Sequence, residues 1–247
     1  MNILGIIPAR FASTRFPGKP LVLLGDRTII QRVYEAAHKA TQWVYVATDD
    51  TRIFDEVKRF GGNVIMTSTS HTSGTDRCAE ALDIIEKETS LRFDVVINIQ
   101  GDEPFIQPEQ IIQLAALFND PASQITTLVK KISAHEDIFD PNKPKVVLDK
   151  NDFALIFSRS PIPYIRGLAK EDWPGDFNFY KHIGIYGYRT EVLREITKLT
   201  PSESELAESL EQLRWLSNGY RIKTATTMHE SIGIDTPEDL ERAIGML

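Results

Sequence analysis

The feature that most constrains the fold of this chain is a regular alternation of two hydrophobic patterns over residues 1–130. Short apolar runs, typical of buried strands, occupy residues 2–7, 43–47, 63–66, 95–99 and 125–129. Segments with apolar residues at helical spacing lie between them, at residues 28–40, 51–60, 73–88 and 108–118. This order predicts an α/β fold with a mostly parallel, doubly wound sheet.

The second half of the chain has a different pattern. Apolar stretches at residues 145–148 and 153–157 flank a polar turn and predict a hairpin, and the proline-rich residues 160–173 predict a loop. Strands are expected at residues 181–188 and 220–227, and helices at residues 191–198, 203–218 and from residue 236 onward. We therefore expect one α/β domain over residues 1–247, with a small inserted hairpin, lobe or dimer arm at about residues 140–190.

Several polar segments follow directly after the predicted strands. They occupy residues 8–21, 48–50, 67–76 and 100–104. Ligands of open α/β sheets bind beyond the carboxyl ends of the strands, so we expect these segments to share one rim. Arg77 lies next to the third segment at a helix start, where anion binding and simple capping explain the sequence equally well.

The loop at residues 8–21, PARFASTRFPGKPL, carries the cations Arg10, Arg15 and Lys19 within ten residues. Guanidinium groups bind phosphate oxygens in bidentate fashion and a lysine supplies a point charge, so the loop suits a triphosphate. The alternative is a solvated basic loop with Gly18 and Pro20 as turn residues. The sequence contains neither GxxxxGK[ST] nor GxGxxG, which disfavours P-loop kinases and Rossmann dehydrogenases.

Two aspartates are candidate metal ligands. Asp102 follows the most apolar strand, in Gln-Gly-Asp-Glu-Pro, where a carboxylate is well placed for Mg²⁺ or, alternatively, for capping the next element. Asp235 precedes Thr-Pro-Glu-Asp, and its sequence alone favours a helix start over a metal site.

Other polar residues have simple structural explanations. His182 lies in an alternating strand beside Tyr186, and a lone histidine is more often structural than catalytic. Residues 211–214 predict the solvated face of an amphipathic helix, and Arg159 suits either an acid or a surface ion pair. The one cysteine, Cys78, excludes an intrachain disulfide and indicates packing.

The composition restricts the class of protein. The net charge of -7 argues against a protein that coats nucleic acid. No apolar run reaches the roughly 20 residues that span a bilayer, and MNILGIIPAR lacks the basic region of a signal peptide. We expect a cytoplasmic enzyme with no nucleic-acid partner and no membrane insertion.

The motifs taken together are more specific than any one of them. In chain order they are IPARFASTRFPGKPL, VATDD, HTSGTDR, NIQGDEPFI, PKVVLD, FSRSPIPYIR, KHIGIYGYR, ESLEQLRWL and GIDTPEDLER. This set, which covers nearly the whole chain, resembles the 3-deoxy-D-manno-octulosonate (Kdo) cytidylyltransferases, or CMP-Kdo synthetases. The first loop alone would indicate only the wider class of sugar nucleotidyltransferases.

The resemblance implies a fold, a reaction and a site. The fold would be that of the nucleotide-diphospho-sugar transferases, similar to GT-A glycosyltransferases, and the enzyme would be a homodimer. CTP and Kdo would give CMP-Kdo and pyrophosphate with Mg²⁺, for lipopolysaccharide biosynthesis. The nucleotide would be bound by Pro8, Ala9, Arg10, Arg15, Lys19, Arg77 and Gln100. Mg²⁺ would be held by Asp102 and Asp235, which with Arg10 and Lys19 form the catalytic group. Kdo would be surrounded by Arg159, His182, Tyr186, Glu211 and Gln212.

Two alternatives remain beside this interpretation. In the first, the chemistry is the same but the acceptor is another 2-keto sugar acid, such as 8-amino-Kdo or an acid of the sialic type. A nucleotide-binding module without catalysis would keep the cationic loop but would not need the paired aspartates.

Overall fold

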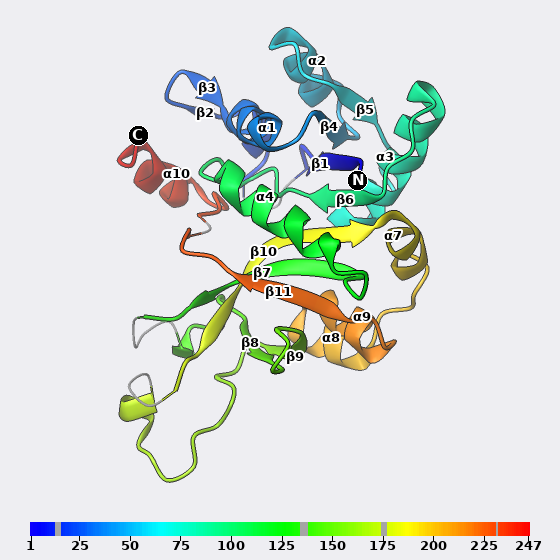
Figure 1. Ribbon diagram of the computed structural model, residues 1–247. Helices are drawn as coiled ribbons and strands as arrows, with labels where there is room; N and C mark the ends of the chain where they lie inside the picture. The colour runs from blue at the N-terminus through cyan, green and yellow to red at the C-terminus, as the bar shows by residue number, and fades with distance from the viewer. Residues whose placement is uncertain (13–15, 134–137, 174–176, 231) are drawn as a thin grey trace.

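The computed structural model describes residues 1–12, 16–133, 138–173, 177–230 and 232–247. Its centre is a nine-stranded sheet, counted over these residues, whose main path runs β11-β7-β10-β6-β1-β4-β5 (Figure 1). The strands of this path are β1 (Ile3–Ala9), β4 (Trp43–Thr48), β5 (Val64–Met66), β6 (Val95–Asn98), β7 (Ile125–Lys131), β10 (Tyr180–Arg189) and β11 (Ile222–Thr226).

The sheet is mostly parallel, as the sequence predicts. β1 pairs in parallel with β4 and β6, β4 with β5, and β11 with β7. β10 runs antiparallel between β6 and β7 and is the exception within the path. The carboxyl ends of β1, β4, β5 and β6 therefore share one edge of the sheet.

Helices cover both faces of the sheet. Those of the first half are α1 (Ile29–Ala40), α2 (Thr51–Arg59), α3 (Gly74–Thr89) and α4 (Pro108–Ala116). Alternate residues of β1 serve the two faces, because Leu4 and Ile6 pack in one apolar cluster with α3, and Ile7 packs in the other with α1 and α2. The predicted doubly wound α/β class is confirmed.

The predicted strands and helices of the first half are all present, with ends shifted by a few residues at most. Side chains of Thr28, Asp50 and Ser73 cap α1, α2 and α3. The structure adds elements that the sequence did not indicate. They are a small hairpin of β2 (Leu23–Leu24) and β3 (Arg27–Thr28) and two 3-10 turns, η1 (Lys19–Leu21) and η2 (Leu117–Asn119).

The expected hairpin of the second half consists of β8 (Lys145–Leu148) and β9 (Ala154–Ser158), and β8 also pairs with the beginning of β10. The hairpin and the irregular segment after it, which includes η3 (Lys170–Asp172), lie at the lower end of the sheet in Figure 1. Whereas the first residues of β10 pair with β8, its last residues lie in the middle of the sheet, between β6 and β7.

One predicted element is wrong. The helix expected over residues 203–218 is two helices, α8 (Glu203–Glu208) and α9 (Gln212–Ser217). Ser209 separates them because its backbone is left-handed, with φ 51° and ψ 48°. The remaining helices are α7 (Thr190–Ile196) and α10 (Pro237–Ile244), which Thr236 caps. In the described residues, no helix combines the length and the apolar character needed to cross a membrane.

Candidate active site

The loops at the carboxyl edge of the sheet enclose a cavity of about 240 Å³. Its walls come from the end of β1 and its loop, the segment before α3, the turn after β6 and the residues before α10. The lining residues are Pro8, Ala9, Arg10, Lys19, Pro20, His71, Thr72, Ser73, Gly74, Arg77, Gln100, Gly101, Asp102 and Asp235. Three of the four segments expected on one rim thus meet here.

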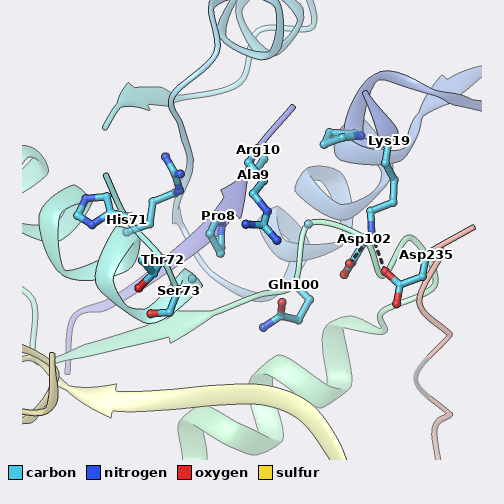
Figure 2. A pocket seen from close by; sticks show the side chains of 14 residues that line it. Pro8, Ala9, Arg10, Lys19, His71, Thr72, Ser73, Gln100, Asp102 and Asp235 are labelled. Atoms are coloured by element: carbon cyan, nitrogen blue, oxygen red, sulfur yellow. Dashed lines mark hydrogen bonds and ion pairs between the residues drawn. The ribbon is translucent and has the colours of Figure 1, made fainter. Parts of the chain in front are cut away.

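A lysine between two aspartates forms one side of the cavity (Figure 2). Lys19 Nζ lies 2.7 Å from Asp102 Oδ2 and 2.9 Å from Asp235 Oδ1. The lysine side chain is 10% exposed, whereas the two aspartates are 34% and 44% exposed. The backbone N–H of Ile234 also donates to the carbonyl oxygen of Asp102, at 2.9 Å. The segment before α10 is therefore fixed against the turn after β6, and the ammonium group offsets the repulsion between the carboxylates.

The loop that carries Lys19 is closed at its base. The N–H of Gly18, at φ 72°, donates to the carbonyl oxygen of Phe11 at 3.0 Å. The guanidinium carbon of Arg52, on α2, lies 3.3 Å from the centre of the Phe11 ring. Arg10 lines the cavity between Lys19 and the start of α3 (Figure 2). Arg15, which the sequence analysis grouped with these two cations, lies outside the described residues.

A close backbone contact joins the two loops that flank the cavity. A Cβ on Gly101 would lie 2.8 Å from the carbonyl oxygen of Pro8. Only glycine allows this approach without a shift of one backbone segment. Gln100 and Asp102, on either side of Gly101, are thereby brought next to the end of β1.

The N-terminal end of α3 forms the opposite wall. Ser73 and Gly74 line the cavity, and the first amide groups of a helix attract anions. Arg77 also lines the cavity, but it is 3% exposed and donates to Asp49 Oδ2 at 2.7 Å and to Thr67 Oγ1 at 2.6 Å. His71, Thr72, Ser73 and Gly74 belong to the segment expected on this rim, although no ligand contact was predicted for any of them individually.

The residues that the resemblance assigned to the sugar acid do not line this cavity. His182 and Tyr186 are neighbours on β10, with ring centres 5.1 Å apart. Glu211, at the start of α9, accepts a hydrogen bond of 2.7 Å from Thr75 on α3, and the adjacent Gln212 is buried. The side chain of Arg159 donates to the carbonyl oxygens of Glu208 and Ser209, in the turn before Glu211, at 2.6 and 3.3 Å.

Burial shifts the pKa values of two of the residues that the resemblance assigned to the sugar acid. It lowers the pKa of His182 to about 3, so the ring is neutral at pH 7. The Thr127 hydroxyl donates to the carbonyl oxygen of Ile185 at 2.7 Å, and His182 Nε2 therefore donates to Thr127 Oγ1 at 2.9 Å. Burial raises the pKa of Glu211, and a hydrogen bond from Thr75 opposes this shift.

Three buried polar atoms beside Glu211 have no hydrogen-bond partner within the described part of the chain. They are the hydroxyl groups of Tyr186 and Tyr188 and Nε1 of Trp215. The rings of Tyr186 and Tyr188 both pack edge-on against Trp215, at 5.0 and 5.6 Å. Unsatisfied buried donors in one place are uncommon and indicate a polar partner.

Comparison with known proteins identifies the family. A family model described as Cytidylyltransferase matches residues 4–224. The 3-deoxy-manno-octulosonate cytidylyltransferase of Bacteroides thetaiotaomicron is 59% identical over 98% of this chain and 97% of its own length. That of Parabacteroides distasonis is 57% identical over 100% of this chain and 98% of its own length. The chain belongs to the 3-deoxy-manno-octulosonate cytidylyltransferase family.

Solved structures agree with this assignment. A CMP:2-keto-3-deoxy-manno-octonic acid synthetase complexed with CTP matches with a TM-score of 0.90 at 40% identity, over 100% of this chain and 98% of that chain. A cytidylyltransferase from Leptospira borgpetersenii shares the fold, with a TM-score of 0.61 at 17% identity over 98% of this chain and 84% of that chain. The family resemblance and the nucleotidyltransferase fold that it implies are both confirmed.

The site contains the charges that a nucleotidyltransferase requires. Cys78 is fully buried, and burial raises the pKa of its thiol, so the reactive thiolate is disfavoured. Transfer of a nucleotidyl group depends mainly on alignment and charge stabilisation. Arg10, Lys19 and the start of α3 supply positive potential around a cavity that also contains two carboxylates.

Proposed function

We propose that the enzyme transfers CMP from CTP to the anomeric 2-hydroxyl of Kdo, with release of pyrophosphate. The observation that carries the proposal is the Lys19–Asp102–Asp235 group at the edge of a cationic cavity. It is found in a chain 57% to 59% identical to proteins named 3-deoxy-manno-octulosonate cytidylyltransferase. The sugar oxygen would bond to the α-phosphorus as the bond to pyrophosphate breaks.

The proposed nucleotide site follows the lining of the cavity. Arg10 and Lys19, together with Arg15, would bind the triphosphate, and the backbone of Pro8 and Ala9 would form the floor beneath it. Arg77 and Gln100 would lie near the cytidine. The similarity to a synthetase complexed with CTP supports this orientation, and the fixed position of Arg77 against Asp49 suits a preorganised wall.

Asp102 and Asp235 would hold Mg²⁺. Their chemistry fits, because Mg²⁺ prefers oxygen ligands and is commonly bound by one or two carboxylates together with substrate phosphates. Both carboxylates contact the one ammonium group of Lys19, so they approach closely enough to share a cation. Among the described residues no group of three or more His, Cys, Asp or Glu side chains could hold a metal by itself. When bound, the ion would offset phosphate charge and help to align the α-phosphate.

The proposed acceptor site consists of the polar residues that lie outside the cavity, around β10 and the start of α9. Arg159 would pair with the carboxylate of Kdo, and His182, Tyr186, Glu211 and Gln212 would bind its hydroxyl groups. The unpartnered hydroxyl of Tyr186 and the neutral ring of His182 support this role, since both suit an uncharged polyol. CTP and Kdo are both anionic, so the cations of the nucleotide site and of the acceptor site would reduce the repulsion between the two substrates.

Pyrophosphate release with CTP, Mg²⁺ and a panel of acceptors tests the proposal. We expect turnover with Kdo and little or none with a sialic acid. CMP transfer to the sialic acid but not to Kdo would show that the acceptor is wrong, and 8-amino-Kdo in the same panel tests the closest analogue. CTP binding without pyrophosphate release for any acid would instead indicate a nucleotide-binding module.

The homodimer, the cytoplasmic location and the role in lipopolysaccharide biosynthesis are part of the same proposal. Leu155 and Ile156 on β9 are 60% and 48% exposed, although successive strand residues face opposite sides. Tyr164 and Phe177, in the irregular segment after the hairpin, are also exposed. We place the contact between two copies on this hairpin, because apolar surface of this kind is characteristic of interfaces.

A further inference from the structure

The first turn of α3 contacts both the cavity and the acceptor group. Ser73 and Gly74 line the cavity, and the next residue, Thr75, is 2% exposed. The Thr75 hydroxyl donates to Glu211 Oε2, 136 residues further along the chain, at 2.7 Å. One short helical turn therefore connects the residues proposed for the two substrates.

The Thr75 hydroxyl is not needed to form the helix. Ser73 is the N-cap of α3, and its hydroxyl accepts from the N–H of Asp76 at 3.1 Å. Threonine has a lower helix propensity than alanine, and hydroxyl groups within a helix commonly bond to their own backbone. The side chain of Thr75 instead reaches a carboxylate on another element, which suggests a role outside α3.

Besides Thr75, the side chain of Ser73 also forms a hydrogen bond with Glu211 and lowers the pKa of its carboxyl group. The guanidinium group of Arg214 lies 3.9 Å from Glu211 Oε1 and is engaged with Glu205 at 2.5 Å. Burial disfavours the ionised carboxylate, so a short hydrogen bond to it has a large effect on its charge and its orientation. The Thr75 hydroxyl supplies such a bond.

We propose that Thr75 is a positioning residue for the acceptor, whose hydroxyl holds the Glu211 carboxylate in the orientation that accepts a hydrogen bond from a sugar hydroxyl. The inference rests on the proposed function of Glu211. It adds that the acceptor site is built on the same helical turn as the nucleotide cavity. The position of the sugar acid relative to the α-phosphate then depends on the contact between Thr75 of α3 and Glu211 of α9.

The test compares Thr75→Val, which has nearly the same shape without the hydroxyl, with Thr75→Ser, which keeps the hydroxyl. The matched control is Thr190→Val, because Thr190 is equally a buried threonine near a helix start and donates to the carbonyl oxygen of Phe93 at 3.1 Å. We expect Thr75→Val to raise KM for Kdo by about tenfold or more. The Kd for CTP, measured by calorimetry, stays within about twofold, and Thr75→Ser and Thr190→Val retain the wild-type KM for Kdo.

The pH profile provides a second measurement. Loss of the Thr75 hydrogen bond raises the pKa of Glu211, so the acid limb of kcat/KM for Kdo moves to higher pH in Thr75→Val. The limb stays in place in Thr75→Ser and Thr190→Val. The titratable and charged groups that influence Glu211 are Asp76, Cys78, Tyr186, Tyr188 and Arg214. None of these variants replaces any of them, although the Thr75 side chain also lowers the pKa of Tyr188.

Two results would overturn the inference. A Thr75→Val enzyme with a normal KM for Kdo and an unmoved acid limb would show that the hydroxyl does not position Glu211. An equal loss of affinity for CTP and Kdo would show that Thr75 serves α3 alone. Both differ from failure of the proposed function, in which the wild-type enzyme itself does not transfer CMP to Kdo.

Discussion

The ammonium group of Lys19 lies between two carboxylates and also lines the cavity proposed for a triphosphate. Its charge offsets the mutual repulsion of Asp102 and Asp235. A divalent cation at the same carboxylates would take over that function and leave the lysine for the phosphates. Lys19 and the proposed metal ion would then compete for one pair of ligands.

The competition predicts the behaviour of Lys19→Met. With the ammonium group removed, Mg²⁺ or Ca²⁺ alone should raise the melting temperature of the variant by a few degrees more than that of the wild type. Lys130→Met is the control, because Lys130 is also paired with a carboxylate, Glu230, at 2.7 Å. Thermal unfolding over a metal titration measures the effect, and equal shifts in wild type and Lys19→Met would contradict the competition.

His182 gives a pH-dependent contribution to stability. Its folded-state pKa of about 3 is below the ordinary value of 6.5, so the unfolded chain binds more protons between these values. Stability from this residue is fully present above pH 6.5 and is lost as pH falls towards 3.

Replacement of His182 by glutamine should remove this contribution. Between pH 6.5 and 5.5, the wild type should lose about 1 kcal/mol of unfolding free energy that His182→Gln does not lose. Urea unfolding at the two pH values measures the difference, with His38→Gln as an exposed control. The same pH dependence in wild type and His182→Gln would show that the ring has the same pKa in the folded and unfolded chain.

Among the elements, the sequence predicted those with a local hydrophobic pattern and missed features that depend on distant partners. Residues 203–218 keep an amphipathic pattern, and nothing local reveals that Ser209 is left-handed. The sequence around Asp235 favoured a helix start over a metal site. The cap is in fact Thr236, whereas the Asp235 carboxylate contacts Lys19, 216 residues away.

The same limit applies to the two candidate sites. The cationic loop and Asp102 follow predicted strands, and parallel pairing alone brings them to one edge. The distance of the acceptor residues from this cavity could not be deduced, because it depends on how β10 enters the sheet and where α9 packs. The partner of Arg77, Asp49, likewise belongs to another strand end.

The contact between the β1 and β6 ends makes Gly101 sensitive to enlargement. Gly101→Ala would force its methyl group against Pro8 O, and we expect a loss of about 1–3 kcal/mol of stability and a lower kcat/KM for CTP. Gly233→Ala is the control, because an added Cβ there meets no atom within 4 Å. Chemical denaturation and steady-state kinetics measure both effects, and wild-type values for Gly101→Ala would show that the loops separate without consequence.

At the scale of the whole molecule, the exposed apolar hairpin predicts self-association. Leu155→Lys should convert a dimer to a monomer, whereas Leu206→Lys, which replaces an exposed leucine on α8, should leave the dimer intact. Sedimentation velocity distinguishes the two states. A monomeric wild type, or a dimeric Leu155→Lys variant, would exclude this surface as the interface.

Asp102 and Asp235, which share Lys19, are proposed to form the reaction centre for CMP transfer. The most direct measurement is kcat for pyrophosphate release from CTP with saturating Kdo and Mg²⁺, in the wild type, Asp102→Asn and Asp235→Asn. Loss of electrostatic stabilisation predicts that each substitution lowers kcat by at least about 100-fold. Near-normal turnover in both variants would contradict the claim.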